Sequence, residues 1–232
     1  MSSFYGKINT LYKRDMTKKG SPIIEGDYVC TEIEALANVK WEATEKIDGT
    51  NMSCEFIPFA DKIVIRGKTE RAAIPNHLLN RMHEIFTLSK LKKVFKRTDA
   101  EGNEVYPNRV EIFGEGYGLK IQKGGNYIPD RCDFILFDVR ITSNDGEVLW
   151  LGREACEDIA NKLGIAVVPF IGYFTIPEAC DLVRNGFIST ISHNREYIAE
   201  GLVLRAPCGL LDRRGERIIT KVKHCDFKNL QK

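Results

Sequence analysis

Glu45-Lys46-Ile47-Asp48-Gly49-Thr50-Asn51 is the segment on which the interpretation of this 232-residue sequence rests. Its lysine ends a strand-like pattern over residues 41–46 and directly precedes an Asp-Gly turn. A second strand-like pattern covers residues 51–57, so the turn is flanked by two predicted strands. On average composition, a lone Lys-x-Asp-Gly arises by chance in roughly one chain in twenty of this length. The segment therefore indicates a function only in combination with other residues of the sequence.

A lysine in this setting can attack phosphorus when its amine is unprotonated. At pH 7, a lysine with the ordinary pKa of about 10.4 has fewer than one amine in a thousand unprotonated. Closing this gap corresponds to roughly 4–5 kcal/mol, so neighbouring cations or a metal must favour the neutral amine. Lys221-Val222-Lys223 supplies two such cations, because residues two apart on a strand face the same side. The alternative is an exposed edge strand whose lysines oppose aggregation.

Two glutamates that adjoin glycines are candidate ligand-binding residues. Glu200 precedes Gly201 at the mouth of an apolar run, and Glu115 lies between two glycines. A buried carboxylate needs a partner, and Mg²⁺ held by one or two carboxylates plus phosphate oxygens is a common one. Glycines let a backbone and a ligand approach closely. Taken singly, each glutamate is more typical of an ordinary charge at the end of a strand.

The remaining pattern predicts a mixed α+β domain with largely antiparallel sheets. Further strands are predicted at residues 62–66, 110–113, 133–141, 201–205 and 217–222, and helices at residues 31–38, 77–97, 153–163 and 177–185. Thr31 and Glu34 form a predicted capping box for the first helix, and Pro75 suits the first turn of the second. Because strands and helices do not alternate strictly, a doubly wound parallel sheet fits less well.

Length and composition indicate a cytoplasmic globular protein with at most one large domain and a small appendage. Its 34 Lys+Arg against 32 Asp+Glu give a net charge of +2, so any nucleic-acid surface must come from local clustering. The basic end of residues 77–97 is either a solvated helix face or such a contact. The start lacks an apolar signal core, and no apolar run has membrane-spanning length.

The seven cysteines are odd in number, scattered, and include no Cys-x-x-Cys pair. Zinc sites need closely spaced ligands, and secreted scaffolds usually carry an even number of cysteines. The pattern therefore predicts reduced and mostly buried thiols in an intracellular protein.

Five segments in order resemble the motifs of the covalent nucleotidyltransferase superfamily, which comprises DNA ligases, RNA ligases and mRNA capping enzymes. They are residues 45–51, Phe113-Gly114-Glu115, residues 134–139, Glu200-Gly201-x-Val203 and Lys221-x-Lys223. The Thr50-Asn51 extension and residues 5–14 look most like ATP-dependent RNA ligases of the phage nick-sealing type. The resemblance implies an α+β adenylyltransferase domain with mostly antiparallel sheets flanked by helices.

The resemblance also implies a role for each matching residue, with Lys46 forming a covalent lysyl-AMP. Glu115 would bind the ribose hydroxyls, Phe137 would stack on adenine, and Thr44 and Glu45 would lie near the adenine edge. Lys221 and Lys223 would contact the AMP phosphate, and Glu200 would position a catalytic metal. Asn51 would act on the 5′-phosphate being activated. The family also places a basic residue downstream of the nucleophile. Arg66 is the preferred candidate, and Lys68 and Arg71 are alternatives.

The implied function is an ATP-dependent RNA ligase that uses ATP and Mg²⁺ or Mn²⁺. It would pass AMP from Lys46 to a 5′-phosphate and join that end to a 3′-hydroxyl, with RNA preferred and a nicked duplex expected. Only residues 224–232 follow the last motif, so a single adenylyltransferase domain is expected, without an OB-fold or a helical domain behind it. A small ATP-dependent DNA ligase and a GTP-using capping-type transferase are alternatives. So is a non-catalytic module that binds nucleic-acid ends, although the retained lysines disfavour it.

Overall fold

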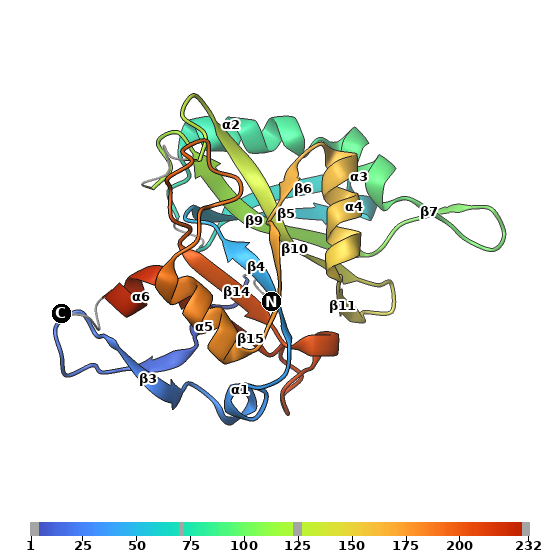
Figure 1. Cartoon of the computed structure of the whole chain (residues 1–232). Coiled ribbons are helices and arrows are strands. Elements are labelled where there is room, and N and C mark those ends of the chain that lie inside the picture. The colour runs from blue at the N-terminus through green and yellow to red at the C-terminus, as the bar shows by residue number, and fades with distance from the viewer. Residues whose placement is uncertain (1–4, 70–71, 123–126, 229–232) are drawn as a thin grey trace. The chain divides into compact units, whose positions relative to one another are not determined.

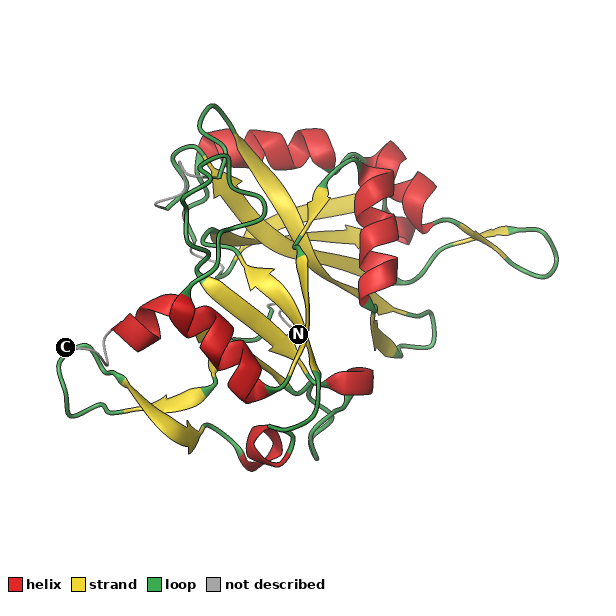
Figure 2. Ribbon diagram, in the orientation of Figure 1, coloured by secondary structure: helices red, strands yellow, loops and turns green. Residues whose placement is uncertain are grey.

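The computed structural model describes residues 5–69, 72–122 and 127–228, and the chain forms two compact units. Unit 1 holds Tyr5 and Asp48–Val167, and unit 2 holds Gly6–Ile47 and the chain from Val168 onward. The chain therefore passes from unit 2 into unit 1 within the Lys-x-Asp-Gly motif. Each unit has its own sheet and its own hydrophobic core (Figures 1 and 2).

Unit 2 is built on a five-stranded sheet in the order β1-β15-β14-β4-β13. The strands are β1 (Asn9–Thr10), β15 (Ile219–Lys223), β14 (Gly201–Arg205), β4 (Trp41–Lys46) and β13 (Phe170–Phe174). All neighbours run antiparallel except β1 and β15, which are parallel. The unit also holds α1 (Thr31–Ala35), α5 (Ile176–Asn185), α6 (His224–Lys228), the short 3₁₀ turn η3 (Pro207–Gly209) and the hairpin of β2 (Tyr12–Arg14) and β3 (Ile23–Tyr28).

The core of unit 2 follows from the period-two alternation of its strands. Trp41 and Ala43 of β4 are fully buried and cluster with side chains of α5 such as Ile176 and Val183. Thr44 and Lys46 lie on the opposite face of the same strand. This alternation leaves one face of the sheet for packing and the other for polar side chains.

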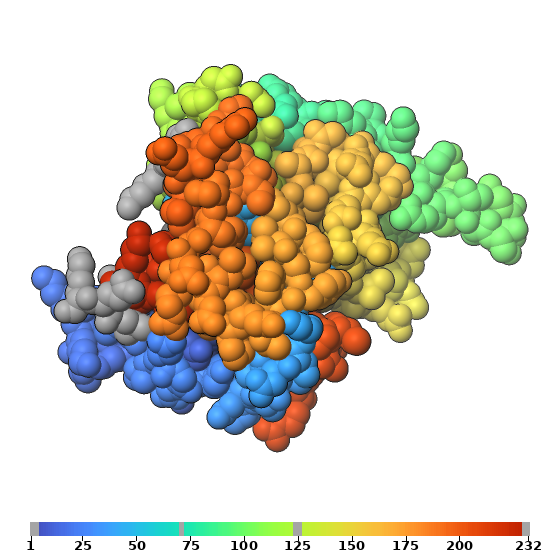
Figure 3. Space-filling view, in the orientation of Figure 1, coloured from blue at the N-terminus to red at the C-terminus, as the bar shows by residue number. Residues whose placement is uncertain are grey.

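Unit 1 contains a six-stranded sheet in the order β11-β10-β9-β5-β6, with β12 added beside β10. The strands are β11 (Val148–Trp150), β10 (Cys132–Thr142), β9 (Arg109–Gly118), β5 (Thr50–Ile57), β6 (Lys62–Gly67) and β12 (Ala166–Val167). Helices α2 (Asn76–Ile85), α3 (Leu88–Phe95) and α4 (Arg153–Leu163) bury their apolar sides against one face of this sheet, and the 3₁₀ turn η1 (Pro58–Ala60) joins β5 to β6. The hairpin of β7 (Arg97–Thr98) and β8 (Glu104–Val105) projects from the unit as a narrow arm (Figure 3).

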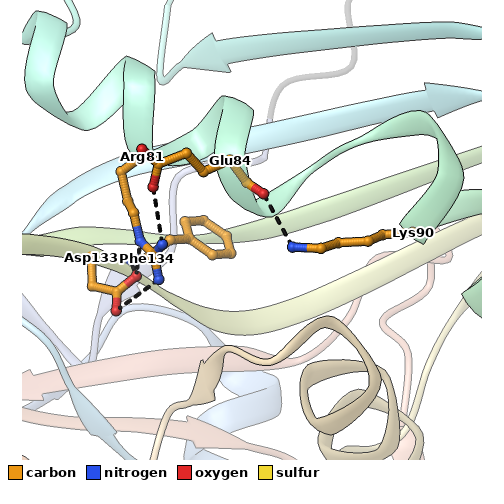
Figure 4. A network of polar contacts seen from close by, with 5 residues as sticks. All are labelled: Arg81, Glu84, Lys90, Asp133 and Phe134. Carbon is orange, nitrogen blue, oxygen red and sulfur yellow. Dashed lines mark hydrogen bonds and ion pairs between the residues drawn. The ribbon is translucent and has the colours of Figure 1, made fainter.

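A polar network fastens α2 to β10 in unit 1 (Figure 4). The Arg81 guanidinium donates to both carboxylate oxygens of Asp133, at 2.9 and 3.4 Å, and to Glu84 at 3.2 Å. Asp133 also accepts from the backbone N–H of Phe134, whose ring is fully buried. The helix is therefore held to the sheet by a charged contact beside the apolar core.

The predicted α+β class with mostly antiparallel sheets is confirmed. The structure reproduces the strands predicted at residues 41–46 and 201–205 and the helix at 153–163. The helix predicted at residues 77–97 is wrong as one element, because Thr87 caps a second helix by accepting from the Lys90 N–H. Pro75 is the N-cap of α2 rather than part of its first turn.

One further local prediction is wrong. Thr31 is not the N-cap of α1, because Cys30 holds that position and its carbonyl accepts from the Glu34 N–H.

The strands predicted on either side of the Asp48-Gly49 turn are confirmed as β4 and β5. They belong to two different sheets, since β4 pairs with β13 and β14 whereas β5 pairs with β6 and β9. The turn therefore connects the two sheets.

Contacts at the basic end of α3 favour its reading as a solvated helix face. Lys92 pairs with Asp61 and Lys96 with Glu104, so these ammonium groups already have acidic partners. All seven cysteines lie within the described residues as thiols rather than disulfides, with Cys54, Cys132, Cys156 and Cys180 buried. Among the described residues, no helix combines the length and apolar character needed to cross a membrane.

Candidate active site

Three neighbouring strands of unit 2 place two lysines on either side of one glycine. Lys46 of β4 is the register partner of Gly201 in β14, and Gly201 is in turn the partner of Lys223 in β15. A Cβ on Gly201 would lie 2.0 Å from the Val222 carbonyl oxygen, and its φ of +153° is one that L-residues rarely adopt. Only glycine therefore allows these strands to approach as they do.

The carboxylate of Glu200 bridges the two lysines. Its Oε2 lies 2.5 Å from Lys46 Nζ, and its Oε1 lies 2.7 Å from Lys223 Nζ. The three side chains are 15%, 18% and 29% exposed, respectively. Burial lowers the pKa of Lys223, but the hydrogen bond and charge of Glu200 outweigh that effect and hold this pKa above its ordinary value. The cluster has two ammonium groups around one carboxylate, a surplus of positive charge suited to phosphate.

Lys221 and Thr44 lie on the same face of the sheet, two residues along their strands from Lys223 and Lys46. Val203 is the register partner of both, with Lys221 on β15 and Thr44 on β4. The Thr44 hydroxyl accepts a hydrogen bond from Arg205 at 3.3 Å. The sheet thus brings Thr44, Lys46, Lys221 and Lys223 to the same face, as the sequence predicts for the lysines.

Glu45 turns to the opposite side of β4 and is 1% exposed. Its carboxylate accepts hydrogen bonds from Ser189 and Thr190, which precede β14 in the chain. Thr44 and Glu45, which the resemblance assigns to one adenine edge, therefore point away from each other.

In unit 1, Asn51 of β5 and Glu115 of β9 are register partners. Gly49 packs against the next residue of β9, because a Cβ on Gly49 would lie 2.5 Å from the Gly116 carbonyl oxygen. The Asp48 N–H donates to the Tyr127 hydroxyl at 3.0 Å. These contacts fix the residues that follow Lys46 on unit 1, with Asn51 and Glu115 side by side.

Phe137 lies at a bulge of β10, where the register with β9 shifts between Leu136 and Asp138. Its ring and the Tyr5 ring form a T-shaped pair with a centroid distance of 5.0 Å. The Tyr5 hydroxyl donates to the buried Asp138 carboxylate at 2.8 Å. Tyr5 thereby sets the surroundings of the aromatic side chain predicted to stack on adenine.

Arg66 is the register partner of Ser53 and lies on the same face of the unit 1 sheet as Asn51. Its guanidinium is 2.5 Å from the Glu55 carboxylate, which Arg109 also approaches at 3.3 Å. Of the alternative basic residues, Lys68 is exposed after β6. Arg71 lies outside the described residues.

The donor set around Glu200 bears on the predicted metal. Within residues 5–69, 72–122 and 127–228, no three His, Cys, Asp or Glu side chains gather closely enough to hold a metal ion. Mg²⁺ in nucleotide enzymes is commonly held by one or two carboxylates, with phosphate oxygens and water completing its shell. Glu200, as a single part-buried carboxylate beside Lys46 and Lys223, fits that arrangement.

Sequence reasoning missed the residues that support this site. Tyr127, Ser189 and Thr190 carry no motif, and they come close to the motif residues only through the fold. Tyr5 begins the segment 5–14 that carries part of the resemblance, but the sequence does not predict its contact with Asp138. The side on which Glu45 lies was readable, however, because period-two alternation places it opposite Lys46 on a strand.

Comparison with known proteins finds both a family model and solved structures that are similar to this chain. A sequence model of the family described as RNA ligase matches residues 39–223, well over half of the chain. This range includes the five motif segments between Glu45 and Lys223.

Solved structures of the RNA ligase of Naegleria gruberi resemble this chain in fold. An apo mutant gives a TM-score of 0.59 at 18% identity, covering 86% of this chain and 53% of that one. A mutant with ATP and Mn gives 0.60 at 16% identity, covering 98% and 62%. The form with PPi gives 0.59 at 17% identity, covering 99% and 62%. This likeness confirms the predicted ligase-type fold, and the chain spans between 53% and 62% of the length of these relatives.

Proposed function

Since the chain belongs to the RNA ligase family, we propose that it is an ATP-dependent RNA ligase adenylyltransferase. The observation that carries this proposal is the cluster of Lys46 and Lys223 around Glu200. A lysine nucleophile with a second cation and a carboxylate beside it has the groups that adenylyl transfer requires. We further propose that residues 1–232 make up a single adenylyltransferase domain.

In the proposed first step, Lys46 Nζ attacks the α-phosphorus of ATP. The N–P bond forms as the bond to the pyrophosphate oxygen breaks, and the amine gives up its proton. Lys223 and Lys221 neutralise the phosphate charge, and Glu115 and Phe137 hold the ribose and adenine. Glu200 would hold Mg²⁺ or Mn²⁺, which would supply further neutralisation of phosphate charge.

In the later steps, the 5′-phosphate of a nucleic-acid end takes AMP from Lys46. A 3′-hydroxyl then attacks that phosphate, and AMP leaves with the electron pair of the broken phosphoanhydride bond. Asn51 acts on the activated phosphate, Arg66 contributes positive charge, and Thr44 lies at the adenine edge. The finer assignment is the phage nick-sealing type acting on nicked duplexes with RNA, supported by the Thr50-Asn51 extension of the lysine motif.

Incubation with α-³²P-labelled ATP and magnesium tests the first step. We expect a labelled protein band that is lost in Lys46→Ala and kept in Lys162→Ala, a lysine of α4 on the other unit whose ion pair with Asp158 is exposed. A band that survives Lys46→Ala, or no band in the wild type, contradicts the proposal.

A nick panel tests the substrate class. ATP is compared with GTP, and nicked duplexes carry RNA or DNA on each side of the nick. Sealing that requires RNA next to the nick supports the RNA ligase assignment. Equal sealing of all-DNA nicks supports a small DNA ligase, and labelling by GTP supports a capping-type transferase.

A further inference from the structure

Glu45 adjoins the nucleophile in the chain, yet its carboxylate serves another part of unit 2. It accepts hydrogen bonds from Ser189 Oγ at 2.5 Å, from the Thr190 N–H at 3.0 Å and from Thr190 Oγ1 at 2.9 Å. Glu45 and Ser189 are 1% and 4% exposed. Because all three donors belong to one segment, the carboxylate fixes that segment rather than facing solvent.

The segment is the loop between α5 and β14 (Figure 1), whose two arms run antiparallel. The Ser189 N–H donates to the Tyr197 carbonyl, and the Ala199 N–H donates to the Phe187 carbonyl, both at 2.9 Å. Ile188 and Ile198 form an antiparallel bridge between these bonds. An arm held by Glu45 is therefore hydrogen-bonded to an arm that ends at residue 200.

The second arm ends at Glu200, whose carboxylate contacts Lys46 and Lys223. Glu200 follows Ala199 directly, and its carboxylate bridges Lys46 and Lys223 at 2.5 and 2.7 Å. The Glu200 carbonyl accepts from the His224 N–H at 2.9 Å, which fixes the backbone at the far end of the loop. The contacts thus run from Glu45 through both arms and return to Lys46, the next residue in the chain.

We infer that Glu45 is a positioning residue, whose carboxylate anchors the α5–β14 loop and thereby sets Glu200 beside Lys46 and Lys223. This inference rests on the proposed function, in which Glu200 acts during adenylyl transfer. The adenine-edge role that the resemblance gives Glu45 is the alternative, and its carboxylate lies on the face opposite Thr44 and Lys46. The two roles make different predictions, because a displaced Glu200 slows the chemical step whereas a lost base contact changes nucleotide selection.

The test compares Glu45→Gln and Thr190→Val with the wild type in single-turnover lysyl-AMP formation at varied ATP. We expect the maximal rate to fall about 10- to 100-fold in Glu45→Gln, because small misplacements of catalytic groups have effects of this order. The ATP concentration at half-maximal rate and the preference for ATP over GTP stay as in the wild type. Thr190→Val lowers the rate in the same direction but less, since it removes one of three donors.

Two further measurements separate positioning from general damage to unit 2. The double variant Glu45→Gln/Thr190→Val loses less rate than the product of the single effects, because both changes break the same anchor. Thr175→Ala, a matched control, weakens the N-terminal cap of α5 in the same unit and leaves the maximal rate unchanged. Hydrogen exchange at the Ser189, Thr190 and Ala199 amides speeds up in Glu45→Gln and stays slow in Thr175→Ala.

The inference is overturned if Glu45→Gln keeps the maximal rate while its preference for ATP over GTP falls. It is also overturned if the loop amides exchange in Glu45→Gln as they do in the wild type. A wild-type protein that never forms lysyl-AMP contradicts the proposed function instead, and the exchange data then still decide whether Glu45 anchors the loop.

Discussion

At the scale of single residues, one glycine makes the lysine–carboxylate cluster possible. Gly201 lies between Lys46 and Lys223 in the cross-strand register, and Glu200 directly precedes it. A side chain at this position would collide with the Val222 carbonyl oxygen and would need a backbone conformation that L-residues rarely adopt. The charged groups of the site therefore depend on a residue that has no functional group.

We expect Gly201→Ala to lower the free energy of unfolding by about 3 kcal/mol, because overpacking and backbone strain add at this position. Lysyl-AMP formation should fall with it, as β14 and β15 move apart. Urea denaturation and ATP labelling measure the two effects. Gly6→Ala serves as the control, since a Cβ there meets nothing within 4 Å. Equal stability of the two variants would show that the strands can relax around a methyl group.

At the scale of elements, two Thr-x-x-Glu segments of unit 2 behave differently. In α5, Thr175 accepts from the Glu178 N–H, and the Glu178 carboxylate accepts from the Thr175 N–H, which forms a capping box. In α1, the segment from Thr31 lies inside the helix, since Cys30 is the N-cap. The same local pattern therefore forms a capping box at α5 and not at α1, because Thr175 lies at the N-cap position and Thr31 does not.

The cap of α5 gives a pH-dependent prediction. The hydrogen bond from Lys40, followed by that from the Thr175 N–H, lowers the pKa of Glu178 from 4.5 to about 2. Because the folded-state pKa is depressed, the stabilisation is complete above pH 4.5 and is lost as the pH falls from 4.5 towards 2. Glu178→Gln should therefore be less stable than the wild type at pH 6, and the gap should narrow at pH 3.

Urea denaturation at pH 6, 4 and 3 measures that gap for Glu178→Gln. Lys40→Met should reproduce most of the same pH dependence, because it removes the largest cause of the shift. A stability difference that stays constant over this range would assign the effect to packing rather than to the carboxylate charge.

At the scale of the whole chain, segments from its two ends meet within unit 2. β1 pairs in parallel with β15, so that Asn9 and Thr10 are register partners of Thr220 and Lys221. Arg14 donates to the buried carboxylate of Asp226 at 2.7 Å, across 212 positions of sequence. β15, the strand that carries Lys221 and Lys223, is therefore paired along one edge with β1 near the N-terminus.

Arg14→Ala should lower the free energy of unfolding by about 2 kcal/mol, because it leaves the Asp226 carboxylate buried without its guanidinium. The neighbouring variant Lys13→Ala removes an exposed ion pair with Asp27 and should cost less than about 1 kcal/mol. Urea denaturation of both variants, and of Arg14→Ala with Asp226→Asn, gives the coupling between Arg14 and Asp226. Additive effects of the two changes would mean that the pair contributes nothing.

The sequence by itself determined the local elements around each motif and the identity of the chemical groups. The strand-like pattern over residues 41–46 and the apolar run over residues 201–205 predict strands, and Lys46, Glu200 and Lys223 are the groups that the proposed adenylyl transfer would use. These signals are local, since they depend on period, turn residues and side-chain chemistry.

Only the tertiary structure decided which strands pair and which side chains from distant segments meet. The lysine motif leads from one sheet into another rather than through a hairpin, because backbone groups of β4 and β5 find partners far away in sequence. The Glu200 carboxylate likewise contacts both Lys46 of β4 and Lys223 of β15, and Ser189 donates to Glu45 across 144 positions of sequence. Such contacts depend on packing of the whole unit, which no local sequence pattern encodes.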